Sequence, residues 1–231
     1  MRYFNLILAA ALLSLGPGLR SAAAQTQPLS ELSPAGGGGA QTIDGVAVRI
    51  EDDILTESEV RELAAFQQLV EGRAKERPDL IRELADQWIV RGEANTAKFP
   101  HPSHEDVERA YAQLAKQFPS PEEFRARCAA VGLSPAAVRR MLELQLYLSR
   151  FIDFRFRPAA QVDDNQVETY YNEEFVPQLK ARGQEVPPLG SVADTIREVL
   201  IQRAINDRAT KWLDETRARL KIDIEAPGAG S

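Results

Sequence analysis

Two histidines followed by a glutamate are the side chains in this sequence best suited to hold a metal ion. His101 and His104 are three residues apart, and Glu105 comes directly after the second histidine. Imidazole and carboxylate are ordinary zinc ligands, but histidines that bind zinc from one helix are spaced four apart, which puts them on one face. Here Pro102 interrupts the stretch, and no further ligand follows closely. We therefore expect an exposed loop at a helix start, and no metal site.

Two pairs of adjacent carboxylates, Asp52-Asp53 and Glu173-Glu174, have the residue types used for general acid–base catalysis. Adjacent side chains on a helix point in different directions, and paired aspartates are common in turns, so neither pair is expected to converge on a substrate. The sequence has no serine-nucleophile motif and no dinucleotide-binding fingerprint. No strand precedes the glycine run 36–39, as a phosphate-binding loop would require. We expect no catalytic residue and no cofactor, and hence no enzymatic activity.

The composition is typical of a soluble globular protein. With 231 residues, of which 44% are apolar and 27% charged, the chain can form one or two domains with a buried core. Its formal net charge is −6. Because nucleic-acid binding depends on Lys and Arg neutralising phosphates, we expect no nucleic-acid partner. Cys128 is the single cysteine, which excludes an intramolecular disulfide, and its helical surroundings predict a small buried apolar side chain.

The first 24 residues have the order of a secretory signal peptide. A basic start at Arg2 leads into an apolar run over 6–15, a Gly-Pro-Gly break and small residues before Gln25. The run is shorter than the ~20 residues that span a bilayer. We expect cleavage of 1–24, a periplasmic or otherwise extracytoplasmic location, and no membrane insertion afterwards. Residues 25–41 are expected to be a flexible linker, and 226–231 a disordered tail.

Alternating apolar residues predict strands near both ends of the remaining sequence. Val46, Val48 and Ile50 alternate before an acidic turn, which predicts a hairpin, and residues 220–224 alternate in the same way. A lone hairpin and a lone strand each need a pairing partner. We expect them to pair with each other, so that residues 42–225 form one domain closed by its last element.

Between these strands, one pattern of helix starts recurs. Ser, Thr or Asp followed three residues later by Glu, Asp or Gln can form a capping box, and proline is favoured in the first helical turn. Apolar residues at i, i+3 and i+4 follow each start. The fold class predicted is mainly α, with about seven amphipathic helices and a small β element. The predicted starts are Thr56, Pro78, Ser103, Ser120, Ser134, Asp163 and Ser191.

The order of these parts resembles the chaperone module of SurA-type and PpiC-type periplasmic folding factors. In that module a strand hairpin leads through an acidic cap into the first helix, as residues 46–60 do here. Later stretches of this sequence resemble the later parts of the module in the same order. They are 84–89, 103–118, the short helix, Gly turn and long helix from 120 onwards, 163–175 and 191–224. The resemblance covers 44–225. It implies an ATP-independent chaperone, or holdase, that binds unfolded or extended polypeptide segments of exported or outer-membrane proteins.

One part of the family pattern is missing. In members with isomerase activity, a parvulin domain of ~100 residues lies before the last helix of the module. Here that interval is the stretch 180–190, which is too short for such a domain. The parvulin histidines also have no counterpart, because the only histidines, His101 and His104, lie far upstream. Prolyl-isomerase activity is therefore not expected.

Aromatic residues crowd the end of one predicted helix beyond what a single buried stripe needs. Phe154 and Phe156 are two residues apart and cannot both face the core that holds Phe151. Either neighbouring helices bury them from both sides, or they form an apolar surface that holds client segments. The candidate client-binding residues are Tyr147, Phe151, Phe154, Phe156, Tyr170, Tyr171 and Phe175. Three arginines lie nearby, and they are Arg150, Arg155 and Arg157. They could donate hydrogen bonds to client carbonyls, or they could form a solvated face.

Two other functions stay open at this point. An adaptor or assembly subunit would bind one native envelope partner at a fixed ratio, whereas a holdase would bind many unfolded chains weakly. A prolyl isomerase is the least favoured alternative, because its site has no counterpart. The long helices that begin near 134 and 191 could also support a homodimer through exchange of the last helix.

Overall fold

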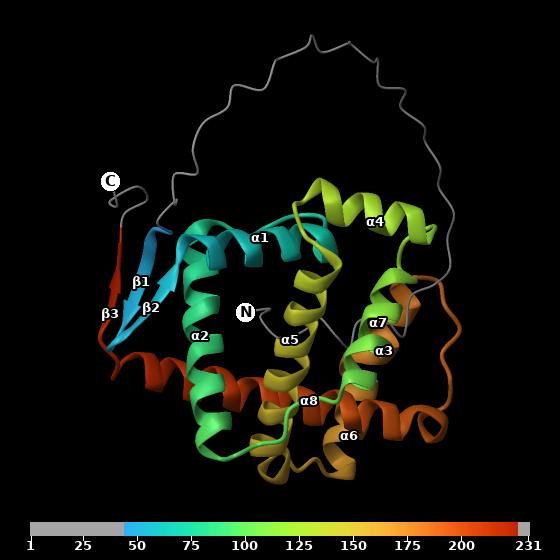
Figure 1. The fold of residues 1–231 in the computed structure, drawn as a ribbon. Helices are drawn as coiled ribbons and strands as arrows, with labels where there is room; N and C mark the ends of the chain where they lie inside the picture. The colour runs from blue at the N-terminus through green and yellow to red at the C-terminus, as the bar shows by residue number, and fades with distance from the viewer. Residues whose placement is uncertain (1–43, 226–231) are drawn as a thin grey trace, which may run out of the picture. The chain divides into compact units, whose positions relative to one another are not determined.

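The computed structural model describes residues 44–225, and a small sheet joins the two ends of that range (Figure 1). Strand β1 (Val46–Ile50) pairs antiparallel with β2 (Asp53–Thr56) on one side and with β3 (Ile222–Ile224) on the other. Ile50 lies opposite both Asp53 and Ile222. The predicted pairing of the hairpin with the C-terminal strand is confirmed.

The central strand is buried because its alternation turns apolar side chains towards the helices. Val48 and Ile50 are fully buried, and Arg49 between them is exposed. The register shifts between Val46 and Val48, and this irregularity lets Ala47 be buried as well. At the hairpin turn, the N–H of Glu51 donates to the carbonyl of Lys221 at 3.0 Å, so the turn is bonded to the approach of β3.

Helices make up most of the described chain, which confirms the mainly α fold class. Because α6, η3 and α7 follow one another without a break, residues 44–225 contain seven helical segments besides a short 3₁₀ turn, η2 (Arg157–Ala159). The bounds are α1 (Glu57–Glu71), α2 (Arg77–Thr96), α3 (His104–Ala115), α4 (Pro121–Ala130), α5 (Pro135–Phe156), α6 (Asp164–Tyr170), η3 (Tyr171–Phe175), α7 (Val176–Ala181) and α8 (Leu189–Arg217).

Most of the predicted helix starts are confirmed. Thr56, Ser103 and Asp163 each form a complete capping box, in which the residue three positions later bonds back to the N-cap amide. Ser120 and Ser134 also cap their helices through the side-chain hydroxyl. These bonds satisfy amides that the first turn of a helix leaves without a partner.

Two predicted starts are wrong in detail. Helix α8 begins at Leu189, not at Ser191, because Pro188 occupies the N-cap position with the extended backbone that precedes a helix. The hydroxyl of Ser191 instead donates to the carbonyl of Pro188 at 2.7 Å. Helix α2 begins at Arg77, one residue before Pro78, and proline is equally compatible with the second helical position.

The core consists of three groups of buried side chains. One lies where the sheet meets α1 and α2, one joins α1 to α3, α4 and α5, and the third joins α2, α5 and α8. Cys128 belongs to the second group and is 3% exposed, so its predicted role as a small buried side chain is confirmed. Burial raises the pKa of its thiol.

Residues 164–200, here called the arm, are packed much less deeply. The arm comprises α6, η3, α7, the following loop and the first turns of α8, and it appears in orange in Figure 1. Within it only Val167 and Ile196 are buried. The rest of the described chain, here called the body, contains all other buried residues.

The π-helical turn in the arm has a local cause. Pro177 lacks an N–H, and its ring would collide with the carbonyl of Glu173 in a regular α-helix. The wider turn over Tyr171–Phe175 avoids that collision, and the N–H of Val176 donates to the carbonyl of Tyr171 five residues earlier. The turn therefore follows from the proline.

The predictions for the two ends concern residues outside the described range. The signal peptide (1–24), the linker (25–41) and the tail (226–231) fall within 1–43 and 226–231. Among residues 44–225, no helix combines the length and the apolar character that crossing a membrane requires.

Candidate functional site

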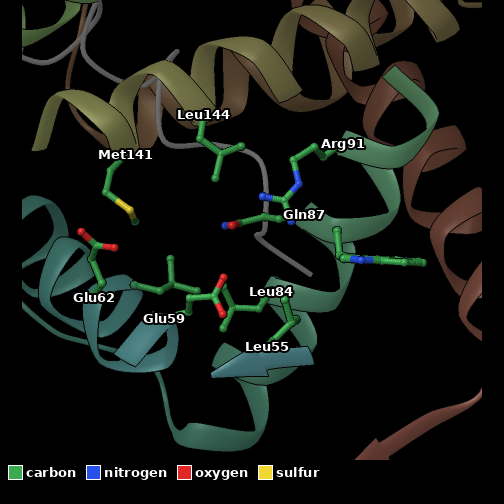
Figure 2. A pocket seen from close by; sticks show the side chains of 10 residues that line it. Leu55, Glu59, Glu62, Leu84, Gln87, Arg91, Met141 and Leu144 are labelled. Carbon is green, nitrogen blue, oxygen red and sulfur yellow. The ribbon is translucent and has the colours of Figure 1, made fainter. Parts of the chain in front are cut away.

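A hollow of about 90 Å³ opens between α1, α2 and α5 (Figure 2). Glu59 and Glu62 reach it from α1, Gln87 and Arg91 from α2, and Met141 and Leu144 from α5. The complete lining is Leu55, Glu59, Glu62, Leu63, Leu84, Gln87, Trp88, Arg91, Met141 and Leu144.

The inner part of the hollow is apolar and firmly held. Leu55, Leu63 and Leu84 are nearly fully buried and belong to the core group between the sheet, α1 and α2. Trp88 contributes its half-buried ring, and its Nε1 donates to Oδ2 of Asp53 at 2.8 Å. This bond ties α2 to the start of β2 and fixes the ring beside the hollow.

Two acids on the α1 side are already occupied by intramolecular bonds. Glu59 accepts the N–H of Thr56 at 2.7 Å as part of the capping box of α1. Glu62 accepts from Arg140 on α5 at 2.7 Å, and this ion pair joins α1 to α5. Both carboxylates therefore already accept hydrogen bonds within the protein.

Gln87 and Arg91 differ from the acids, because neither side chain has a hydrogen-bond or ion-pair partner among residues 44–225. Both point from α2 into the hollow (Figure 2). They are four residues apart, which places them on one face of the helix. The hollow therefore offers an apolar floor beside an amide and a guanidinium that can both donate to a ligand.

The dimensions limit what can bind there. A dry apolar cavity of about 150 Å³ holds benzene, so about 90 Å³ suits one aliphatic side chain and not a cofactor. The lining contains no arrangement of nucleophile and base among the described residues. The hollow has the size and lining to accommodate an apolar side chain next to hydrogen-bond acceptors.

The sequence-based candidates for client binding lie elsewhere. Tyr147 and Phe151 are 2% and 1% exposed and form part of the core between α2, α5 and α8, so they offer no surface to a client in this conformation. The Tyr147 hydroxyl donates to Oδ1 of Asn95 at 3.0 Å. Burial raises the pKa of this phenol.

Phe154 and Phe156 have different surroundings, as their spacing required, because Phe156 packs against the core group that holds Phe151 and Phe154 is exposed. Phe154 is 62% exposed, and its ring packs against Phe99, which also touches Phe151. Phe156 is half-buried against Trp212 of α8. Phe154 is thus the member of the aromatic set that solvent reaches most freely.

Tyr170, Tyr171 and Phe175 belong to the arm and are half-buried. The rings of Tyr171 and Phe175 stack at 5.9 Å, and the Tyr171 hydroxyl donates to the carbonyl of Pro187 at 2.8 Å. The guanidinium of Arg203 lies over the Tyr170 ring. No ring contact among the described residues joins this group to the aromatic residues of α5, so the structure does not bring the two halves of the predicted surface together.

The three arginines proposed to face client carbonyls are all ion-paired. Arg150 bonds Asp106 at 2.8 Å, and Arg155 bonds Glu93 at 3.1 Å. The hydrogen bond from Arg150 lowers the pKa of Asp106 far below its usual value. These partners leave each guanidinium less free to bind a client than Arg91.

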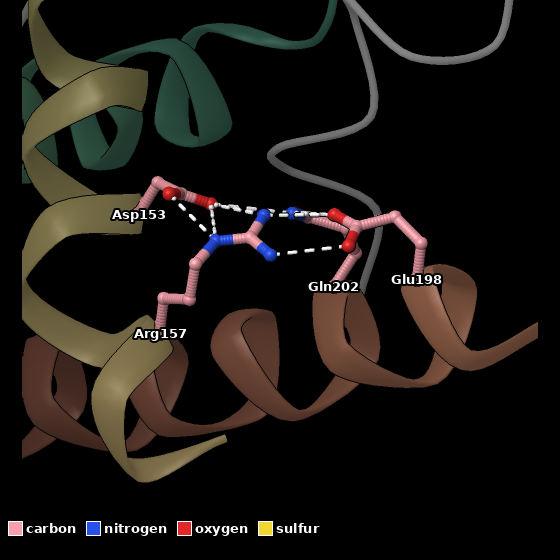
Figure 3. A network of polar contacts seen from close by, with 4 residues as sticks. All are labelled: Asp153, Arg157, Glu198 and Gln202. Carbon is pink, nitrogen blue, oxygen red and sulfur yellow. Dashed lines mark hydrogen bonds and ion pairs between the residues drawn. The ribbon is translucent and has the colours of Figure 1, made fainter. Parts of the chain in front are cut away.

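Arg157 lies at the centre of a denser network at the end of α5 (Figure 3). Its guanidinium donates to Asp153 and to Glu198, at 2.8 and 2.7 Å, and Gln202 bonds both acids. The hydrogen bond from Arg157 lowers the pKa of Glu198. Glu198 lies in the arm and Asp153 in the body, so the network connects the two.

Several of the residues considered for metal binding or acid–base chemistry contact other side chains of the fold. His101 stacks on the Tyr147 ring at 4.1 Å, and His104 is the first residue of α3. Among residues 44–225, no group of three or more His, Cys, Asp or Glu side chains could hold a metal ion. Asp53 accepts from Trp88, and Glu174 bonds Arg203 at 2.9 Å.

The hollow was missed from the sequence, although a signal for one wall exists. Leu84, Gln87 and Arg91 have the spacing of a single helical stripe, in which a polar and a charged residue follow a leucine. A stripe that changes from apolar to polar usually marks the edge of a core. Only the approach of α1 and α5 turns that edge into a hollow.

The comparisons with known proteins leave the family open. No protein-family model matches this chain, and no curated protein matches its sequence.

Proposed function

We propose that this chain is an ATP-independent chaperone that holds extended segments of exported proteins, and that the hollow between α1, α2 and α5 is where it holds them. The observation that carries the proposal is the apolar floor beside two donors without partners, Gln87 and Arg91. An extended polypeptide presents the complementary features, since apolar side chains alternate with backbone carbonyls.

The expected affinity suits reversible holding. Burying one aliphatic side chain contributes about 1.5–3 kcal/mol, and a hydrogen bond adds about 1 kcal/mol. Several weak contacts of this kind bind many sequences without selecting one. Such binding lowers the concentration of free unfolded chain by mass action and requires no nucleotide.

The resemblance to SurA-type and PpiC-type modules and the signal-peptide pattern of residues 1–24 support the client class and a periplasmic location. Both are part of the proposal. An adaptor for one envelope partner is the alternative, and the experiment below separates the two.

The test is the aggregation of an outer-membrane β-barrel protein diluted from urea, with and without the purified full chain. We expect suppression at near-stoichiometric amounts without ATP. Gln87→Trp should fill the hollow and raise the concentration needed for half-suppression about tenfold, equivalent to 1.4 kcal/mol. Gln113→Trp is the matched control, since Gln113 is exposed on α3 and is not part of the hollow.

Absence of suppression for several unrelated clients would overturn the chaperone proposal and favour the adaptor. Equal suppression by wild type and Gln87→Trp, with both folded by circular dichroism, would remove the hollow from the proposal. Addition of the chain to a proline-containing test peptide should leave its isomerisation rate unchanged, and a rate that rises with protein concentration would contradict a non-catalytic role.

A further inference from the structure

We propose that the hollow prefers extended segments in which an acidic side chain lies two residues away from the apolar one, and that Arg91 makes this selection. The inference rests on the proposed function, because it concerns the ligand of the same hollow. It goes further by naming a sequence pattern and the residue that recognises it.

The charged residues that line the hollow differ in whether they have partners. Three lining residues are charged, and they are Glu59, Glu62 and Arg91. Glu59 accepts the Thr56 amide within the cap of α1, and Glu62 is paired with Arg140. Arg91 has no such partner among the described residues. Arg91 is therefore the charged lining residue, among those described, whose hydrogen-bonding groups are free for a ligand.

Arg91 is unusual among the arginines of α2 and α5. Arg82 bonds Asp214, Arg139 bonds Glu108, and Arg155 bonds Glu93. A guanidinium that points into the hollow and has no carboxylate partner is well suited to receive one from outside. A carboxylate can bond it through two parallel N–H donors, which is stronger than a bond to a neutral carbonyl.

The spacing follows from helix and strand geometry. Leu84 and Arg91 are seven residues apart, or about 10 Å along α2. Both side chains lean towards the N-terminus, and the longer arginine leans further, so the guanidinium lies less than about 10 Å from the Leu84 side chain along α2. In an extended segment, residues i and i+2 face the same side and are about 6.7 Å apart. An apolar residue on the leucine floor therefore places its second neighbour near Arg91.

Gln87 completes the arrangement. It lies between Leu84 and Arg91 on the same stripe and points into the hollow (Figure 2). Its amide can donate to a backbone carbonyl of the residue between the apolar and the acidic side chain. The three residues thus address three successive features of one extended segment.

The experiment measures fluorescence anisotropy of short labelled peptides with the full chain. One pair contains Leu-Ser-Asp or Leu-Ser-Asn within a Gly/Ser sequence, and a second pair has the reverse order, so either chain direction is tested. We expect the better Asp peptide to bind about threefold to fivefold more tightly than its Asn partner, as for an exposed ion pair. The ratio should approach one in about 0.5 M NaCl, because salt screens exposed charges.

Arg91→Gln should abolish the preference for Asp, because the Asp peptide loses its ion pair and then binds the variant no more tightly than the Asn peptide does. Arg125→Gln is the matched control, since Arg125 is exposed on α4, pairs with Glu122 at 2.6 Å and is not part of the hollow. This variant should retain the preference. Equal affinity for Asp and Asn peptides in both orders would overturn the inference while the proposed function stands, as would a preference that survives in Arg91→Gln. Binding of no peptide to the wild type would overturn both.

Discussion

The body and the arm of this fold are held together by different forces. In the body, residues from the sheet and from α1 to α5 and α8 form three apolar groups, in which side chains such as Phe66 and Phe151 are 1% exposed. In the arm, Val167 and Ile196 alone are buried over residues 164–200. Ion pairs and polar bonds hold the arm instead, including Glu174 with Arg203 of the body and Tyr171 with Pro187.

This difference indicates where the protein is rigid. Apolar burial stabilises in proportion to area, whereas exposed ion pairs contribute 0–1 kcal/mol, so the arm is expected to open locally before the body unfolds. The hollow lies in the body, between α1, α2 and α5. A binding site with a preformed floor pays little ordering entropy on binding.

The largest expected effect compares one aromatic residue from each region. Phe151→Ala should lower the free energy of unfolding by about 3–5 kcal/mol, because the ring is fully enclosed and leaves a cavity. Phe175→Ala should cost about 1 kcal/mol, because Phe175 is half-buried beside Tyr171. Urea unfolding followed by circular dichroism measures both. Similar costs at the two positions would mean that the arm shares the core of the body.

The network between the regions should give an intermediate effect. Glu198→Gln removes the acid that Arg157 bonds at 2.7 Å and should destabilise by about 1 kcal/mol at neutral pH, because the pair is partly exposed. Amide hydrogen exchange in α6 and α7 should accelerate more than exchange in α2. Uniform acceleration across both regions would contradict a role at the boundary.

The same substitution has a pH signature. Arg157 lowers the pKa of Glu198 below the ordinary value of 4.5, so the unfolded state binds the proton more readily. The stability this carboxylate contributes is complete above pH 4.5 and is lost as the pH falls through its lower native pKa. The stability difference between wild type and Glu198→Gln should therefore shrink below pH 4.5, and a difference that grows there would contradict the assignment.

The smallest expected effect concerns the π-helical turn. Pro177→Ala restores an N–H and removes the collision with the Glu173 carbonyl, so the arm should relax towards a regular α-helix. We expect a gain of a few tenths of a kcal/mol, seen as slower hydrogen exchange in α7 and not in α5. Unchanged exchange in α7 would show that the π turn does not depend on the proline.

Local chemistry made much of the fold predictable. Capping residues such as Thr56, Ser103 and Asp163 act on amides only a few positions away, so the sequence determines these helix starts. At Ser191 the same Ser-x-x-Asp pattern does not mark the helix start, because Pro188 has the extended N-cap conformation and α8 begins directly after it, at Leu189. Strand pairing was predictable because a lone strand requires a partner.

The candidate site was much less predictable. Tyr147 and Phe151 differ from Phe154 in burial because of how α2 and α8 cross α5, and helical periodicity alone does not contain that crossing. The hollow depends on the same information, since its residues come from α1, α2, α5 and the end of β2. Propensity determines a helix and its faces, whereas a site between helices is a property of their tertiary contacts.

The place of β1 in the sheet also governs when the chain can fold. Its neighbour β2 follows after a two-residue turn, whereas Lys221, at the approach of β3, bonds Glu51 across 170 residues. Closing so long a loop is slow relative to forming local helices, and during synthesis the N-terminal parts emerge first. One edge of β1 therefore stays unpaired until the last strand has been synthesised. During that stage the nascent protein exposes unpaired backbone, as do the extended segments that it is proposed to hold.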